Sequence, residues 1–238
     1  MSKGFKELKD EQRKLRDSWT STSAQGAGLR VHRALSWLKA AEECVKMEDG
    51  INKNKGIQVS HIDTQFMHLW IAFNALYGQE QTFASPHLSE KESFKGFFEK
   101  LLPFDSDNKL QSIAWDNYSQ HINTFINNQY VFAPYWEFVK GGITEKEWQT
   151  KFKLSKELTT YSFGKRNDIP KFLGLIFERL YVLRNQIMHG GATFNGSVNR
   201  SQMKDGTHIL AELIPAIIEI VMNNPEENWG IPTYPPIV

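Results

Sequence analysis

Residues 170–191 of the sequence, PKFLGLIFERLYVLRNQIMHGG, decide the fold. Their apolar side chains return every three or four positions, which is the spacing of one face of an α-helix. Pro170 suits the first turn of such a helix, because the N–H that proline lacks has no intrahelical partner there. Gly190 and Gly191 suit its end, because glycine readily adopts the left-handed conformation that closes a helix. The pattern therefore predicts a helix over 170–189.

Similar signals recur along the rest of the chain, whereas alternating strand patterns are nearly absent. Capping boxes, in which a Ser or Thr precedes an acidic residue by three positions, are predicted at Ser60–Asp63, Ser89–Glu92 and Thr144–Glu147. Apolar spacing predicts further helices over 28–48, 61–77, 90–102, 107–127, 145–158 and 207–223. We therefore expect an all-α protein, a helical bundle of about seven helices.

The two ends of the chain differ from this helical body. Residues 1–25 are rich in charge and hold few apolar anchors, so we expect a charged, loosely held N-terminal arm before a helical domain over 26–238. The C-terminal stretch 229–236, WGIPTYPP, is kept extended by its prolines. Its aromatic side chains predict that it packs back on the helical domain.

Composition restricts the class of protein. The 238 residues are 40% hydrophobic, which suits a globular chain with a substantial core. Cys44 is the single cysteine, so an internal disulfide is excluded and a reducing compartment is favoured. No apolar run is long enough to span a membrane and the first residues lack a signal-peptide core, so we expect a cytoplasmic protein without a membrane partner. A net charge of +1 limits any nucleic-acid contact to a local patch.

Arg184, Asn185 and His189 are the candidate functional residues of the helix over 170–189. A guanidinium can hold a phosphate through two donors, and an imidazole can move protons near neutral pH. Five positions turn a helix by about 140°, so Arg184 and His189 converge only if the helix ends near His189. The double glycine indicates that it does. The alternative is a surface arginine together with a histidine that complements the helix dipole.

Arg184 also continues an apolar stripe formed by Leu173, Phe177 and Leu180. A charge in such a position is costly unless it is paired or faces a crevice or a partner chain. An arginine that served only solubility would more often share the polar face with Glu178. The displaced charge therefore favours a functional role for Arg184.

Asn74 is a polar residue within the apolar arc of the helix predicted over 61–77. A buried amide needs hydrogen-bond partners, because burial without them is destabilising. One interpretation is a bond from Asn74 to a neighbouring backbone carbonyl. The other is that Asn74 orients Arg184 or His189 as a supporting residue of the site.

Basic residues flank the candidate site in sequence. They are Lys165, Arg166 and Lys171 on one side, and Arg200 and Lys204 on the other. These side chains are candidate contacts for an RNA backbone, with an ordinary solvated surface as the alternative.

No metal or cofactor site is expected. His61 and His68 lie on one predicted helix without a Cys or carboxylate at ligand spacing. The glycine-rich stretch 190–197 follows a helix, whereas a phosphate-binding loop follows a strand and leads into a helix. We therefore expect 190–197 to be a flexible loop that covers the site.

The stretch Arg184–His189 resembles the signature of the HEPN superfamily, in which Arg, usually Asn, Asp or His, and three further residues precede His. Residues 69–78, LWIAFNALYG, are similar to the first long helix of the Apea-like branch, which also carries a polar residue near its site. The resemblance covers 61–78 and 170–222. It implies a metal-independent endoribonuclease of toxin or anti-phage defence systems, without a cofactor, whose site forms where the two subunits of a homodimer meet. RNA is the implied substrate, and a cognate antitoxin or regulatory protein is a further candidate partner.

The chemistry of these residues agrees with that activity. RNA carries its own nucleophile, the 2′-OH, so an enzyme needs only to move protons and stabilise the charge that develops at the phosphate. His189 would transfer protons, Arg184 would stabilise the charge, and Asn185 would position the phosphate or His189. One histidine per chain does not easily serve as both acid and base, whereas a two-fold dimer supplies two.

Two other functions fit the same residues. One is a non-catalytic HEPN-like module that binds RNA, a nucleotide or a protein. The other is a structural bundle in which Arg184 and His189 only complete a helix end, so that replacing Arg184 would change stability alone.

Overall fold

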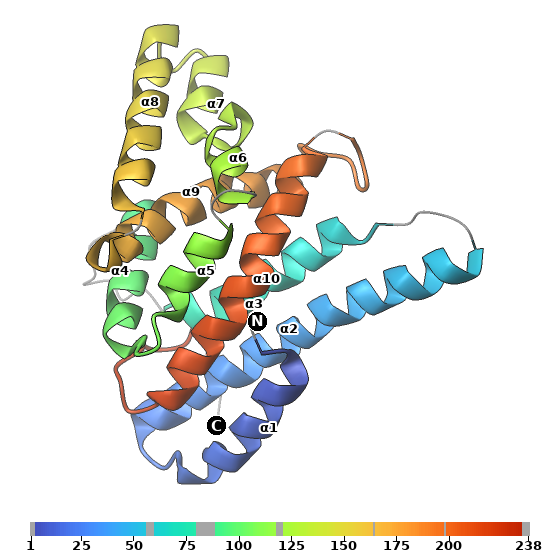
Figure 1. Cartoon of the computed structure of the whole chain (residues 1–238), viewed down its shortest axis with the longest axis vertical. Helices are drawn as coiled ribbons and strands as arrows, with labels where there is room; N and C mark the ends of the chain where they lie inside the picture. The colour runs from blue at the N-terminus through green and yellow to red at the C-terminus, as the bar shows by residue number, and fades with distance from the viewer. Residues whose placement is uncertain are drawn as a thin grey trace. The chain divides into compact units, whose positions relative to one another are not determined.

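The computed structural model describes residues 3–55, 60–79, 89–117, 121–163, 165–197 and 199–234. These residues form α-helices and short 3-10 helices. Gln79 and Pro232 form an isolated antiparallel β-bridge. The prediction of an all-α protein is confirmed (Figure 1). Among the helices in these ranges, none combines the length and the apolar character that a membrane-spanning segment requires.

Two compact units divide the chain. One holds Met1–His87 and Leu210–Val238, and the other holds Leu88–Ile209. The boundary expected between residues 25 and 26 falls inside helix α2 (Thr22–Lys55). The first residues and the helix that follows them therefore belong to the same unit.

The first unit is built on the packing of α2 against α3 (Ile62–Tyr77). Both correspond to predicted helices, and α2 extends beyond the predicted 28–48 at each end. Phe66 and Phe73 of α3 are fully buried, as expected for an apolar helix face. The other elements of this unit are α1 (Phe5–Leu15), the 3-10 helix η1 (Arg16–Ser18) and the part of α10 (Arg200–Asn223) that follows residue 209.

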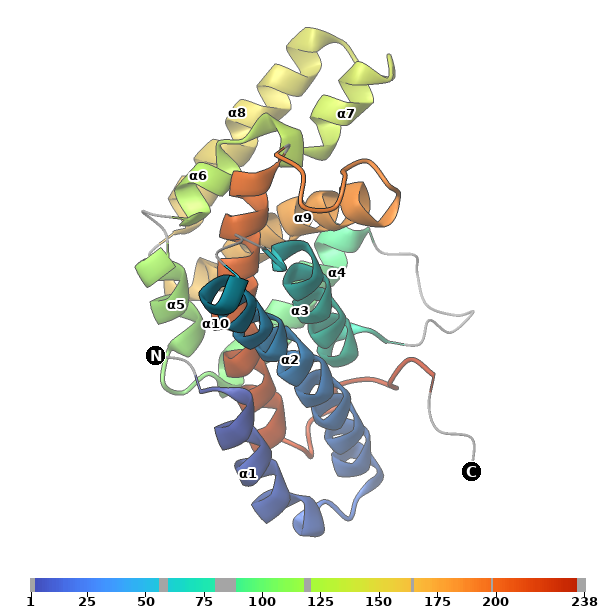
Figure 2. The same ribbon diagram turned by 90° about the vertical axis from the view of Figure 1, so that its right-hand side faces the viewer.

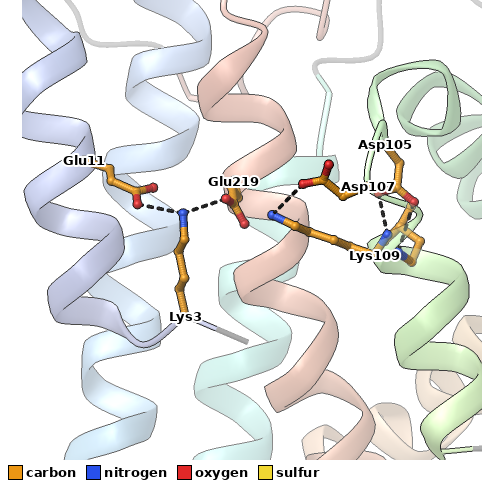
Figure 3. Close-up of polar contacts among 7 residues, drawn as sticks. Lys3, Glu11, Asp105, Asp107, Lys109 and Glu219 are labelled. Carbon is orange, nitrogen blue, oxygen red and sulfur yellow. Dashed lines mark hydrogen bonds and ion pairs between the residues drawn. The ribbon is translucent and has the colours of Figure 1, made fainter. Parts of the chain in front are cut away.

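Helix α1 is fixed to the first unit. Leu8 is fully buried, and Lys3 Nζ donates to Glu11 at 2.6 Å and to Glu219 of α10 at 2.7 Å (Figure 3). These hydrogen bonds raise the pKa of Lys3 above its ordinary value. The expectation of a loosely held arm is therefore wrong for α1, because the buried Leu8 and the bridging Lys3 anchor a helix whose other residues are mostly polar.

Arg30 and Trp229 hold the C-terminal tail on the same unit. The buried Arg30 guanidinium donates to the carbonyl of Gly78 at 2.7 Å, just past the end of α3, and to that of Gly230 at 3.1 Å. Trp229 is buried as well. The prediction that the aromatic side chains of the tail pack back on the helices is confirmed for Trp229, whereas the side chain of Tyr234 is 84% exposed. The remaining residues of the tail lie outside the described ranges.

The second unit contains α4 (Glu90–Leu101), η2 (Leu102–Phe104), α5 (Lys109–Asn117), α6 (Asn123–Ile126), η4 (Gln129–Val131), α7 (Ala133–Val139), α8 (Glu145–Ser162), η5 (Arg166–Asp168), α9 (Ile169–Met188) and the first part of α10. Its core is the pair α4 and α9, where the ring centroid of Phe177 lies 5.0 Å from that of Phe98 and 5.9 Å from that of Phe94. Helices α7 and α8 lie side by side (Figure 2).

Helix starts follow the predictions at two of three capping boxes. Ser89 and Thr144 form the expected boxes of α4 and α8. The box at Ser60–Asp63 is wrong, because α3 begins after His61, which makes no side-chain capping bond. The His61 N–H donates instead to Glu48 Oε2 at 3.0 Å, so a carboxylate from α2 replaces the local cap.

The helix predicted over 107–127 corresponds to two shorter helices, α5 and α6, and residues 118–120 lie outside the described ranges. The buried Asp105 carboxylate starts α5 by accepting the N–H groups of Lys109 at 2.8 Å and Leu110 at 3.0 Å (Figure 3). Helix α7 has no predicted counterpart, since a helix of two turns is too short to display apolar periodicity.

Candidate functional site

The end of α9 has the predicted geometry. The helix stops at Met188, and Gly190 adopts a left-handed φ of +69°. The Gly190 N–H donates to the Ile187 carbonyl at 3.1 Å, and the Gly191 N–H donates to the Gln186 carbonyl at 2.7 Å. This pair of bonds is the Schellman motif, which satisfies carbonyls that the last turn leaves unpaired. The double glycine therefore ends the helix at Met188, with His189 as the residue that caps it.

Arg184 lies at the edge of the core, as its place in the apolar stripe predicted. Leu173, Phe177 and Leu180 of the stripe are fully buried, and Arg184 is half-buried. Its Nη1 donates to Asn185 Oδ1 at 2.8 Å. Its Nε is buried without a hydrogen-bond partner in the part of the chain that the structure describes. The guanidinium is thus partly desolvated and held on one side by Asn185.

Asn185 and His189 line a cavity of about 950 Å³ in the second unit. Its walls are η4 and α7 on one side, the last two turns of α9 on another, and the loop after α9 with the first turn of α10 on the third. His189 is exposed within it, and Asn185 is half-buried. Arg184 is not among the lining residues, so it reaches the cavity through its bond to Asn185.

Three hydrogen bonds hold the elements around this cavity together. Gln186 Nε2 donates to the Tyr130 carbonyl at 2.6 Å, and Trp136 Nε1 donates to the same carbonyl at 2.8 Å. Asn199 Nδ2 donates to Gln186 Oε1 at 2.8 Å. Gln186 therefore links α9 to η4 and to the start of α10. None of these four residues was a candidate from sequence, although the aromatic-rich stretch 130–138, YVFAPYWEF, was a visible signal.

The five basic residues that flank the motif are not gathered around the cavity. Arg200 lines it, with Nε donating to the Gly196 carbonyl at 3.1 Å. Lys171 lies at the other end of α9, roughly 20 Å from Asn185 along the helix axis. Lys165 and Arg166 precede that end, and Lys204 is exposed on α10 without lining the cavity. The expected basic track therefore reduces to Arg200 at this site.

Lys165 and Arg166 have local partners instead. Lys165 Nζ lies 3.5 Å from the ring centroid of Tyr161, and Arg166 Nη2 donates to the Asp105 carbonyl at 3.0 Å. These contacts fix the start of α9 to α8 and to the turn before α5.

Asn74 is exposed on α3 in the first unit, whereas Arg184 and His189 belong to the second. The expectation of a buried amide is therefore wrong. Its neighbours Phe73 and Leu76 carry the buried face of α3, and Asn74 contributes a backbone carbonyl that accepts the Gly78 N–H at 2.7 Å.

His68, His121 and His208 do not line the cavity. His121 Nδ1 lies 2.8 Å from Asp205 Oδ1, and the ring centroids of His121 and His208 are 4.2 Å apart. His68 Nδ1 lies 3.6 Å from Cys44 Sγ. In the described residues, no group of three or more His, Cys, Asp or Glu side chains is arranged to hold a metal ion.

Comparison with known protein families, with curated proteins and with solved structures gives no match to this chain.

Proposed function

We propose that this protein is a metal-independent endoribonuclease of HEPN type that acts in toxin or anti-phage defence. The observation that carries the proposal is the shared cavity of Asn185 and His189, with Arg184 bonded to Asn185 at its edge. In this assignment the 2′-OH of the substrate attacks the adjacent phosphorus, the P–O5′ bond breaks, and a 2′,3′-cyclic phosphate and a 5′-hydroxyl remain.

Each residue of the motif has a place in that reaction. The exposed His189 is accessible to substrate and can accept the 2′-OH proton or protonate the leaving oxygen. The half-buried Arg184 can stabilise the charge on the phosphate more strongly than a fully solvated arginine, because water screens it less. Asn185 orients the guanidinium through its Oδ1.

We propose further that two chains assemble into a homodimer around one cleft. A single His189 would have to act as acid and base in turn, whereas a two-fold dimer supplies one histidine for each role.

A non-catalytic module that binds RNA or a nucleotide is the second candidate. It is favoured by the absence of Arg184 from the cavity lining in the described residues, together with the aromatic and amide groups that do line it. Under this alternative RNA binds and stays intact.

Cleavage of a defined RNA in the presence of EDTA separates the two candidates. The wild-type protein should cut it and leave 2′,3′-cyclic phosphate ends, detected by mass spectrometry, while single-stranded DNA stays intact. His189→Ala and Arg184→Ala should each lower the rate by at least about 100-fold. His32→Ala, at an exposed histidine of the first unit, is the matched control and should cut normally. Equal rates for all four proteins, or loss of cleavage with EDTA, would exclude the proposed chemistry.

A further inference from the structure

We propose that the cavity beside His189 binds one unstacked nucleotide of single-stranded RNA, with its base against Tyr130 and Trp136. The inference rests on the proposed ribonuclease function and deepens it, because it assigns a part of the substrate to η4 and α7, which lie outside the regions that resemble HEPN proteins. A base held in this cavity would also place the adjacent phosphate at a fixed position relative to the proposed catalytic residues.

Aromatic side chains belong to the wall that η4 and α7 form. Tyr130 is 44% exposed, and Trp136 is half-buried with its Nε1 bonded to the Tyr130 carbonyl. Tyr135 contacts both rings edge-on, with ring centroids 5.4 Å from each. The indole is therefore held in place before a ligand arrives, and stacking a base on it costs little side-chain entropy. Unpaired bases in RNA bind proteins through such aromatic surfaces.

Two amides supply polar groups that could read a base edge. Arg184 occupies Asn185 Oδ1, which leaves the Asn185 N–H₂ group as a donor. Gln186 Oε1 accepts from Asn199 Nδ2, which leaves Asn199 Oδ1 as an acceptor. No other described residue bonds to these two free ends. Because the Watson–Crick edge of every base combines donors and acceptors, one free donor and one free acceptor on the same cavity suit a nucleobase better than an apolar ligand.

The charges on the cavity suit the sugar–phosphate part of the ligand. Lys140 and Arg200 line it with one acidic residue, Glu137, and His189 adds an imidazole. A phosphate next to the bound base would meet these cations, and the volume of about 950 Å³ is in the range of small-ligand sites. A phosphate held at the His189 side of the cavity would also lie near the group proposed to transfer protons.

The test uses binding, so that it does not depend on cleavage. Fluorescently labelled RNA oligonucleotides with 2′-fluoro substitution keep the bases and phosphates and lack the attacking hydroxyl. Their dissociation constants for the wild-type protein, Trp136→Leu and Tyr130→Leu are measured by fluorescence anisotropy. Each variant should bind at least about tenfold more weakly, because it removes an aromatic face on which the base stacks.

Trp115→Leu is the matched control. Trp115 is 60% exposed in the same unit, stacks on Phe163 and does not line the cavity, so its replacement should leave binding unchanged. Tyr130→Leu guards against misfolding of Trp136→Leu, since the Tyr130 carbonyl that anchors Trp136 and Gln186 belongs to the backbone and is retained. Circular dichroism checks that each variant keeps its helical content.

A set of oligonucleotides with one abasic position identifies the bound base. Loss of the base at one position should weaken binding to the wild-type protein by about tenfold. The same abasic position should hardly change binding to Trp136→Leu, because the missing base and the missing indole belong to the same contact. Additive losses at every position would overturn the assignment of the base to Trp136.

The outcomes separate this inference from the proposed activity. If the wild-type protein binds as expected and leaves natural RNA intact, the nucleotide site stands and the ribonuclease proposal fails. If natural RNA is cut and Trp136→Leu binds and cuts like the wild type, the nucleotide site is overturned and the ribonuclease proposal stands. Nucleoside monophosphates that bind as tightly as the oligonucleotides would overturn the assignment to RNA.

Discussion

Two helices carry a buried arginine that donates to no carboxylate in the described part of the chain, and the two side chains are satisfied to different extents. Arg30 donates to backbone carbonyls at the end of α3 and in the tail. Arg179 is 2% exposed and has a single hydrogen bond, from Nη2 to Ser155 Oγ at 3.2 Å, and its Nη1 has no partner among the described residues. The Phe132 ring lies 4.0 Å from its guanidinium carbon. Burial lowers the pKa of Arg179 well below its ordinary value, to about 9.

Arg179→Met should therefore stabilise the protein at neutral pH, by about 1 kcal/mol or more in the free energy of unfolding. Below about pH 9 the buried charge of Arg179 destabilises the folded state fully. As the pH rises further, the folded state loses this proton at a lower pH than the unfolded chain does. The stability of the wild type should then rise relative to that of the variant from about pH 9 upward, until the unfolded chain loses the same proton. Urea unfolding of both proteins at about pH 7 and about pH 10 measures the difference, in which other titrating groups cancel.

Arg30→Met is the comparison for that experiment. It should destabilise the protein by about 2–4 kcal/mol, because the buried Leu76 carbonyl and the half-buried carbonyls of Gly78 and Gly230 lose their donor. The two arginines would not differ as proposed if Arg30→Met were more stable than the wild type, or if Arg179→Met were less stable than the wild type at every pH.

At the scale of one element, the end of α9 determines where His189 lies. The left-handed Gly190 turns the chain out of the helix, and the Gly190 and Gly191 N–H groups close the last turn. A Cβ at Gly190 would meet no atom within 4 Å, so any cost of an alanine there comes from backbone conformation rather than from crowding.

Gly190→Ala should lower the free energy of unfolding by about 1–2 kcal/mol, since an L-residue resists a φ of +69°. It should also slow cleavage, because a relaxed helix end displaces His189. Gly96→Ala is the control of opposite sign, as Gly96 lies inside α4 with nothing within 4 Å of the added Cβ. It should raise stability by about 0.5–1 kcal/mol and leave cleavage unchanged. If both variants changed the free energy of unfolding in the same direction, the left-handed conformation of Gly190 would not limit which residue can end the helix.

For the whole molecule, the proposed activity predicts assembly, because a single chain places only one His189 on the cavity. We expect a two-fold homodimer of about 55 kDa, twice the 27.5 kDa of one chain, by light scattering. Adding an excess of His189→Ala chains to wild-type protein, with time for exchange, should lower activity more steeply than the wild-type fraction, because each mixed dimer lacks an acid or a base. A strictly monomeric protein that cuts RNA, or activity proportional to the wild-type fraction, would contradict a shared site.

The sequence by itself determined the features that depend on one or two turns of helix. Ser89, Thr144 and the glycines at 190 and 191 start and end helices as predicted, because a capping bond joins residues that are two to five positions apart. The apolar stripe that places Arg184 at the core edge was equally visible, since the helical period alone sets which side chains share a face.

Only the tertiary structure decided which distant elements meet. Tyr130 and Asn199 lie far from Gln186 in sequence, and their hydrogen bonds to it assemble the cavity. Asn74 is an example of burial that the sequence could not predict. An apolar helix is covered only where a neighbouring element packs on it, and the packing of α3 leaves Asn74 exposed. The contacts of Arg30 with the tail likewise join residues about 200 positions apart. Such contacts depend on complementary surfaces that form only in the folded chain, and no local pattern of residue types encodes them.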